Sequence, residues 1–133
     1  MASKLRSHSE LDVYKRSVEI AMAVYEHSKS FPREEVFSLT DQIRRSSRSV
    51  SANIAEAWRK RRYPASFVSK INDAEAEAAE SQVWIEYAVK CRYLTRTTGA
   101  SLYRDCDRLI ATLVGMVRHH EKWTFPRTPT ARS

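Results

Sequence analysis

Glycine, proline and long apolar runs are all scarce in this sequence, and each scarcity narrows the choice of fold. Only two glycines and four prolines occur among 133 residues, fewer than turn-rich β folds require. The sequence has no run of about 18 apolar residues and its N-terminus lacks the apolar core of a signal peptide, so neither a membrane partner nor export is expected. The composition predicts a single all-α domain in the cytoplasm.

Cysteine is equally rare, and the residue types that usually build catalytic sites do not cluster. Cys91 and Cys106 lack a Cys-x-x-Cys spacing and fall on helical apolar patterns, which favours two buried, reduced thiols over a disulfide. His119, His120 and Glu121 are consecutive, so on a helix they diverge by about 100° each and cannot share a metal ion. Glycine-rich phosphate loops, nucleophile elbows and Glu-x-x-His pairs are absent. We therefore expect no enzyme, no cofactor and no metal.

Charge is plentiful and unevenly distributed. The formal net charge is +7, which favours an acidic partner such as nucleic acid, although a basic protein can also simply be soluble. Residues 44–62 hold seven basic side chains and one acidic side chain, whereas residues 71–89 hold five acidic side chains and no Lys or Arg. This polarity is expected to pair helices or subunits.

The stretch 38–62 is predicted to be a helix with two chemically different faces. Ser38, three residues before Asp41, resembles a capping box, and Tyr63-Pro64 predicts the end of the helix. At about 100° per residue, its apolar side chains share one sector and its basic side chains lie roughly opposite. Most charge runs are merely solvated, so a binding face and a solvated face both remain open. The candidate nucleic-acid-binding residues are Arg44, Arg45, Arg48, Arg59, Lys60, Arg61 and Arg62.

Three further helices are predicted over about 10–30, 64–96 and 101–121, with Ser9 capping the first and Gly99 closing the third. Short connections between four long helices favour an antiparallel up-and-down four-helix bundle, with a core over about 10–121 and short tails. Trp123 and Phe125 are candidate anchors for the closing segment. The expected core contains Val24, Ile43, Val50, Ile54, Ile71, Ile85, Leu109 and Leu113.

Two surfaces are expected to contact another helix or another subunit. A short polar flank separates the apolar and basic sectors of residues 38–62, and the helix over 64–96 carries more apolar surface than one bundle core can bury. Broad apolar surface of this kind often marks association. The candidate contact residues are Gln42, Asn53, Glu56, Glu80, Trp84 and Tyr87.

The run FPREEVFSLTDQIRRSSRSVSANIAEAWRKRR at residues 31–62 resembles the family of small four-helix-bundle proteins encoded in 23S ribosomal RNA intervening sequences. The resemblance extends over roughly residues 11–118 and includes Phe67 and Glu80-Ser81-Gln82. Ser38 and Ala57 stand where many members have glycine. The positions that carry the resemblance are Phe31, Pro32, Glu34, Glu35, Leu39, Thr40, Gln42, Arg44, Arg45, Asn53, Ile54, Ala55 and Glu56.

The resemblance implies an antiparallel bundle that assembles into a homopentameric ring without known catalytic activity. The accessory proteins of diversity-generating retroelements are similar as well, and they bind a reverse transcriptase and nucleic acid. Two functions therefore stay open for this chain. It is either an accessory protein that binds structured RNA or DNA through its arginines, or a protein-interaction scaffold that binds no nucleic acid.

Overall fold

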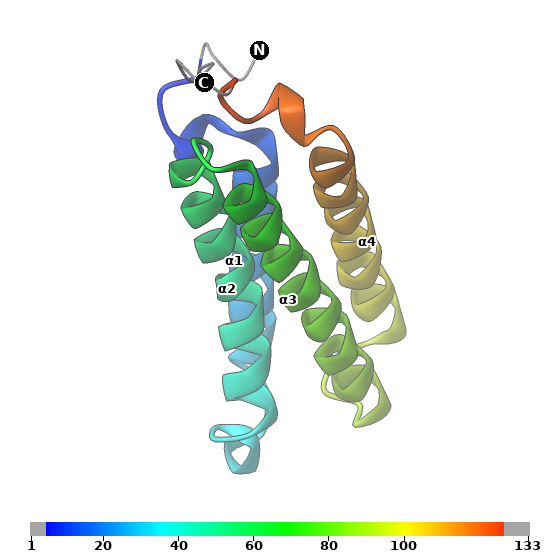
Figure 1. Ribbon diagram of the computed structural model, residues 1–133. Coiled ribbons are helices and arrows are strands. Elements are labelled where there is room, and N and C mark those ends of the chain that lie inside the picture. Colours follow the sequence, from blue (N-terminus) through cyan, green and yellow to red (C-terminus); the bar gives the residue numbers. More distant parts are fainter. Residues whose placement is uncertain (1–4, 127–133) are drawn as a thin grey trace.

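The computed structural model describes residues 5–126. In this part of the chain, four α-helices run alternately in opposite directions and connect by short turns (Figure 1). The described residues contain no strand, so the predicted all-α, up-and-down four-helix bundle is confirmed. The helices are α1 (Asp12–Ser28), α2 (Leu39–Arg59), α3 (Pro64–Lys90) and α4 (Arg96–Arg118), with short 3-10 helices η2 (His8–Glu10), η3 (Arg33–Glu35) and η4 (His120–Lys122).

A single core fills the space between the four helices, and the sequence predicted its centre correctly. All eight core residues expected from the helical pattern are at most 3% exposed. Helices α2 and α3 share the most extensive contact. On the α3 side of this contact the buried residues include Ala74 and Ala78, whose small side chains let the two helices approach closely.

At least one short polar contact links each pair of neighbouring helices, and four of these contacts have the same length. Each is a side-chain hydrogen bond of 2.8 Å, and short bonds of this kind require both partners to stay at one height along the bundle. These contacts therefore fix the axial register, which apolar packing alone specifies less sharply. The pairs are Ser17–Ser51 for α1 and α2, Ser46–Ser81 for α2 and α3, Gln82–Asp107 for α3 and α4, and Arg16–Thr112 for α1 and α4.

The predicted cap of α1 is wrong, and Ser38, although it is the residue that precedes α2 as predicted, makes no capping hydrogen bond to that helix. Ser9 lies inside η2, and Leu11 is the residue that precedes α1. At α2, the Ser38 hydroxyl donates to Glu35 Oε1 at 2.7 Å, and the Leu39 N–H donates to the same oxygen at 3.2 Å. A carboxylate near a helix N-terminus also complements the helix dipole, so Glu35 caps α2 in place of the predicted Ser38-Asp41 box.

The boundary between α3 and α4 also differs from the prediction. Helix α3 ends at Lys90, and Arg92 adopts a left-handed φ of 65°. The Arg92 N–H donates to Val89 O at 2.9 Å and the Tyr93 N–H donates to Ala88 O at 2.8 Å, the paired bonds of a Schellman motif. Glycine usually occupies that left-handed position, so an arginine there concealed the turn from the sequence pattern.

Gly99 lies inside the first turns of α4, where it does not cap α3. Helix α4 begins at Arg96, after Thr95 Oγ1 accepts a hydrogen bond from the Thr98 N–H at 3.1 Å. A Cβ added to Gly99 would overlap the Cγ2 methyl of Val89 on α3. Glycine is therefore needed at this position because α4 crosses close to α3.

The two cysteines have different surroundings. Both lie in the described part of the chain and are free thiols. Cys106 is buried as predicted, and burial raises the pKa of its thiol to about 12. Cys91 is exposed, contrary to the prediction, because α3 has already ended and the chain has left the helical pattern that would have carried this side chain into the core.

Tyr93 joins the α1–α2 and α3–α4 connections, which lie at the same end of the bundle (Figure 1). The Tyr93 hydroxyl donates to Glu35 Oε2 at 2.8 Å, and the rings of Tyr93 and Phe31 lie 5.5 Å apart. This hydrogen bond to a carboxylate raises the pKa of Tyr93 from 10.0 to about 12. The pKa of Glu35 is lowered, first by the Ser38 hydroxyl and then by Tyr93. The α1–α2 and α3–α4 connections are thus held together.

The two glycines give a matched test of the packing between α3 and α4. We expect Gly99→Ala to lower the free energy of unfolding by about 1–3 kcal/mol, because the added methyl overlaps Val89. Gly115→Ala should raise it by about 0.5–1 kcal/mol, because a Cβ there meets open space among the described residues and helical glycine is entropically costly. Urea unfolding at equal protein concentration measures both. Equal stability of the two variants would refute the close approach at Gly99.

The Tyr93–Glu35 bond predicts a loss of stability at alkaline pH. The pKa of Tyr93 is higher in the folded protein, so its contribution is fully present below about pH 10 and is lost as the pH rises through about 12. Tyr93→Phe removes this contribution. Urea unfolding between pH 8 and pH 11 should therefore show a steeper decline for the wild type than for Tyr93→Phe. Parallel pH profiles would contradict the assignment.

Candidate nucleic-acid interface

The arginines of α2 point outward because the opposite, apolar side of the helix is buried in the core. Ile43 and Ile54 are each 1% exposed, and Trp58 is 3% exposed. With this side packed into the core, the helical repeat places the basic residues on the surface. The amphipathic pattern expected from the sequence is therefore present in the folded chain.

Three of the predicted arginines gather around one shallow groove on the N-terminal half of α2. We call it the α2 groove, and its volume is about 430 Å³. Three guanidinium groups face one carboxylate, so the groove carries a net positive charge. Its lining residues are Val36, Thr40, Asp41, Arg44, Arg45, Arg48, Ser49 and Ala52.

Two of these arginines, Arg44 and Arg48, contact side chains of helix α1. Arg44 Nε donates to the Ser28 hydroxyl at 2.7 Å, and its guanidinium lies 4.9 Å from the centre of the Tyr25 ring. The guanidinium of Arg48 lies 5.7 Å from the same ring. An arginine side chain has five N–H donors, so a single bond at Nε leaves the terminal nitrogens of Arg44 able to bind an anion. Tyr25 and Ser28 therefore restrict the positions of both groups without neutralising them.

Arg45 lies at the border between the basic and acidic segments. Its Nη2 donates to Gln42 Oε1 at 3.0 Å, and its charge partly opposes a raised pKa at Glu77 on α3. Burial is the main cause of that raised pKa, and the neighbouring Glu80 adds to it. The acidic segment of α3 thus comes close to the basic segment of α2 within one protomer.

The remaining basic residues form a second cluster where α2 ends. Arg59, Lys60 and Arg62 are exposed. Arg59 and Arg62 line a recess of about 280 Å³. The other residues that line it are Trp58, Arg61, Tyr63 and Phe125.

Arg61 serves a structural role in this second cluster. Its guanidinium lies 3.4 Å from the ring centre of Trp58 and 4.7 Å from that of Phe125, and its Nε donates to Trp58 O at 2.7 Å. The Phe125 N–H donates to Arg61 O at 3.1 Å. Burial, followed by repulsion from Arg59, lowers the pKa of Arg61. The expected anchoring of the closing segment is confirmed for Phe125, and Trp123 also packs against the core.

The predicted arginine band is divided into these two clusters. Arg59 lies eleven positions after Arg48, a distance of about 16 Å along the helix axis. The intervening residues include Glu56, which pairs with Lys70 of α3 at 2.7 Å. The basic side chains therefore do not form one continuous row along α2, and each cluster is a separate contact area.

Three of the predicted contact residues make bonds within the protomer. Gln42 accepts from Arg45, and Glu56 pairs with Lys70 of α3. Asn53 Nδ2 donates to Ser49 O of its own helix at 2.9 Å. Glu56 thus contacts another helix, α3 of the same chain, whereas the bonds of Gln42 and Asn53 stay within α2.

The other three predicted contact residues lie together on the surface of α3. Trp84 Nε1 donates to Glu80 Oε2 at 3.1 Å, and the Trp84 and Tyr87 rings are 6.0 Å apart. Tyr87 is 54% exposed and the nearby Val83 is 42% exposed. This apolar surface remains available to a partner.

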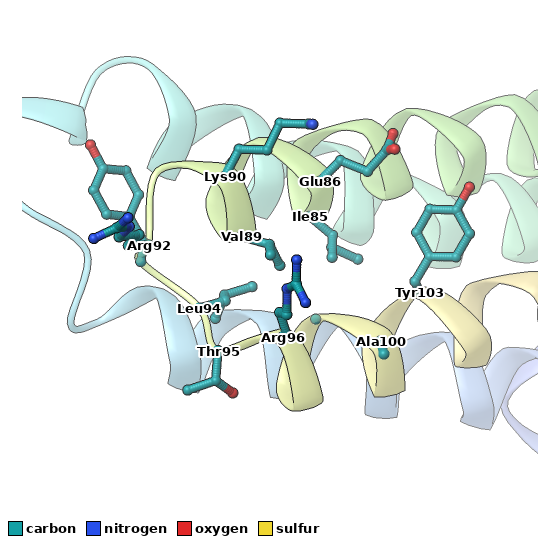
Figure 2. Close-up of a pocket in the computed structure, with 12 residues that line it drawn as sticks. Ile85, Glu86, Val89, Lys90, Arg92, Leu94, Thr95, Arg96, Ala100 and Tyr103 are labelled. Atoms are coloured by element: carbon teal, nitrogen blue, oxygen red, sulfur yellow. The ribbon is translucent and has the colours of Figure 1, made fainter.

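A larger groove that the sequence did not indicate lies between the end of α3 and the start of α4. We call it the α3–α4 groove, and its volume is about 840 Å³ (Figure 2). Sequence reasoning missed it because the prediction continued α3 to residue 96, whereas residues 91–95 form the turn that opens the groove and α4 already begins at Arg96. It is lined by Ile85, Glu86, Val89, Lys90, Arg92, Tyr93, Leu94, Thr95, Arg96, Gly99, Ala100 and Tyr103.

Residues 5–126 contain no group of three or more His, Cys, Asp or Glu arranged to hold a metal ion. Within the same range, each helix is too short or too polar to cross a membrane.

Comparisons with known proteins agree with the fold. No curated protein matches the chain. A crystal structure at 1.70 Å resolution, of a protein with unknown function from the S23 ribosomal protein family of Bacteroides thetaiotaomicron VPI-5482, is 31% identical. Its TM-score is 0.72, and the match covers 80% of this chain and 98% of that chain. A family model described as 23S rRNA-intervening sequence protein matches residues 9–115. The chain therefore belongs to the 23S rRNA-intervening sequence protein family.

Proposed function

We propose that this protein is a non-enzymatic, homo-oligomeric accessory protein that binds structured RNA, or retroelement RNA and DNA, through the two basic clusters of α2. The observation that carries the proposal is the α2 groove, where Arg44, Arg45 and Arg48 converge and α1 holds two of them in place. Arginine suits this task because its planar, permanently charged group matches the geometry of phosphate oxygens.

Assembly supplies the affinity that one protomer lacks. Each protomer offers only a few exposed arginines, and a contact with a few phosphates is weak at physiological salt. Several copies that act on one polynucleotide gain avidity without any new type of contact. We propose a ring, pentameric by resemblance to the family, and the α3 surface around the exposed Tyr87 and the partly buried Trp84 supports self-association.

Recognition is expected to depend on backbone and shape. Tyr25, the aromatic ring that contacts the arginines of the α2 groove, is half-buried and already has the guanidinium groups of Arg44 and Arg48 over it at 4.9 and 5.7 Å, so a base would compete with them for stacking. In the second cluster, Tyr63 is 60% exposed and is the nearest stacking candidate. Phosphate contacts position a nucleic acid without reading its sequence.

A protein-interaction scaffold is the second candidate function. It is favoured by the exposed Tyr87 and Val83 of α3 and by the ion pair between Glu56 and Lys70, in which a charged side chain of α2 contacts α3 of the same chain. In this case the α2 arginines would be a solvated face. A reverse transcriptase is a candidate protein partner under either function, by similarity to the retroelement accessory proteins.

Salt-dependent binding separates the two functions. We expect structured RNA and duplex DNA to bind the wild type with an affinity that falls as salt rises. Arg45→Gln with Arg48→Gln should weaken binding and flatten the plot of log affinity against log salt by roughly one unit per lost phosphate contact. The matched control is Arg104→Gln with Arg108→Gln, which removes two exposed charges from α4.

The outcome depends on the comparison between these two double variants. Equal losses would mean that net charge alone attracts the nucleic acid, and the α2 groove would lose its assigned role. If the wild type shows no salt-sensitive binding, the scaffold function replaces this proposal. We expect each variant to assemble like the wild type, because the substituted side chains are exposed in the protomer. Sedimentation velocity checks this expectation.

A further inference from the structure

The connection between α1 and α2 displays an unusually exposed phenylalanine. Phe37 is 93% exposed and its neighbour Val36 is 46% exposed. Burying a phenyl ring contributes more free energy than burying most other side chains, and Phe37 makes no such contribution while its ring is in water. An isolated exposed residue needs no explanation, but a fully exposed Phe next to an exposed Val forms a compact apolar projection.

The backbone that carries Phe37 is well fixed on both sides. The Val36 N–H donates to Arg33 O at 3.1 Å and the Ser38 N–H donates to Glu35 O at 2.9 Å. The Glu35 carboxylate bonds to Ser38, to the Leu39 N–H and to Tyr93. The ring is therefore presented on an ordered turn, and little conformational freedom is lost when it binds.

The α3–α4 groove has the size and the chemistry to accept such a projection. Its floor includes Ile85, which is fully buried, and Leu94, which is 7% exposed. Its rim carries Lys90, Arg92 and Arg96, opposed by Glu86 alone (Figure 2). The groove thus combines an apolar base with a positively charged edge. Within residues 5–126, Phe37 does not fill the groove of its own protomer, because its ring is almost entirely exposed.

The turn that carries Phe37 has the opposite charge. Residues 33–41 contain Glu34, Glu35 and Asp41 against a single basic residue, Arg33. A positively charged rim and an acidic turn attract each other and favour one orientation of docking. An exposed apolar projection with acidic neighbours therefore complements an apolar groove with a basic rim.

The positions of the two features suit a cyclic assembly. The α1–α2 turn and the α3–α4 turn lie at the same end of the bundle, opposite the α2–α3 connection (Figure 1). Rotation about an axis parallel to the helices leaves height unchanged, so a projection and its groove must lie at the same height to meet around a ring. Each protomer carries one of each, and such a heterologous contact can close into a ring.

We propose that Phe37 of one copy inserts into the α3–α4 groove of a second copy, with the acidic turn against Lys90, Arg92 and Arg96. This inference rests on the self-association in the proposed function and names the contact that would produce it. The phenyl ring of Phe37 from the neighbouring copy fills the apolar base of the groove.

Phe37→Asp tests the projection, with Met22→Asp as the matched control at an exposed apolar residue of α1 that lies in neither proposed contact surface. Phe37→Asp should weaken self-association by about 30-fold or more, as expected for a central aromatic anchor, and shift the mass toward the 15.4 kDa monomer. Met22→Asp should change it much less. Mass photometry and sedimentation velocity measure the assembly, and circular dichroism checks that the helices remain intact. Ala100→Trp, which fills the groove from its exposed edge, should act like Phe37→Asp.

A disulfide trap tests the contact directly. In a Cys91→Ser background, Phe37→Cys with Ala100→Cys should form intermolecular cross-links on mild oxidation, whereas Phe37→Cys with Met22→Cys should not. If the wild type assembles but Phe37→Asp assembles equally well and no cross-link forms, this contact is wrong and the proposed function stands. If Phe37→Asp dissociates while Ala100→Trp stays assembled, Phe37 uses another surface and the groove assignment fails. A monomeric wild type overturns both this contact and the proposed assembly.

Discussion

The burial of the apolar side of α2 is the constraint on which the rest of the structure depends. Ile43, Ile54 and Trp58 are packed between α1 and α3, and this packing orients every other side chain of the helix. The arginines face outward because the helical repeat leaves them no other side. Hydrogen-bonded pairs of small polar residues, such as Ser46 with Ser81, then fix the height of each helix in the bundle.

The surrounding elements give the basic residues of α2 different roles. Arg44 and Arg48 are held by α1 through Tyr25, whereas Arg61 is enclosed between Trp58 and Phe125 and fixes the closing segment. A charged group stacked between two aromatic rings contributes mainly to packing. The positive charge that a phosphate could reach is therefore concentrated in two areas, and a polynucleotide that bridged them, within one protomer or between copies, would contact both.

Much of the fold could be predicted from the sequence, because helical periodicity and the rarity of glycine and proline leave few alternatives. The central helix and the buried positions such as Val50 and Leu113 followed from this pattern. The end of α3 did not, since Arg92 adopts a conformation that glycine usually marks. The role of Arg61 depends on Phe125, which lies 64 residues away in the sequence. The exposure of Phe37 depends on how the turns pack, so no local pattern predicts it.

The central claim is that assembly and the α2 arginines act together on one nucleic acid. Native mass spectrometry of the protein with a structured RNA hairpin tests this most directly, because it reports the number of protein copies and RNA molecules in each complex. The account predicts one RNA bound to one complete oligomer, with RNA released as the ammonium acetate concentration rises. Separate RNA molecules bound to individual protomers, or an oligomer that binds no RNA, would contradict it.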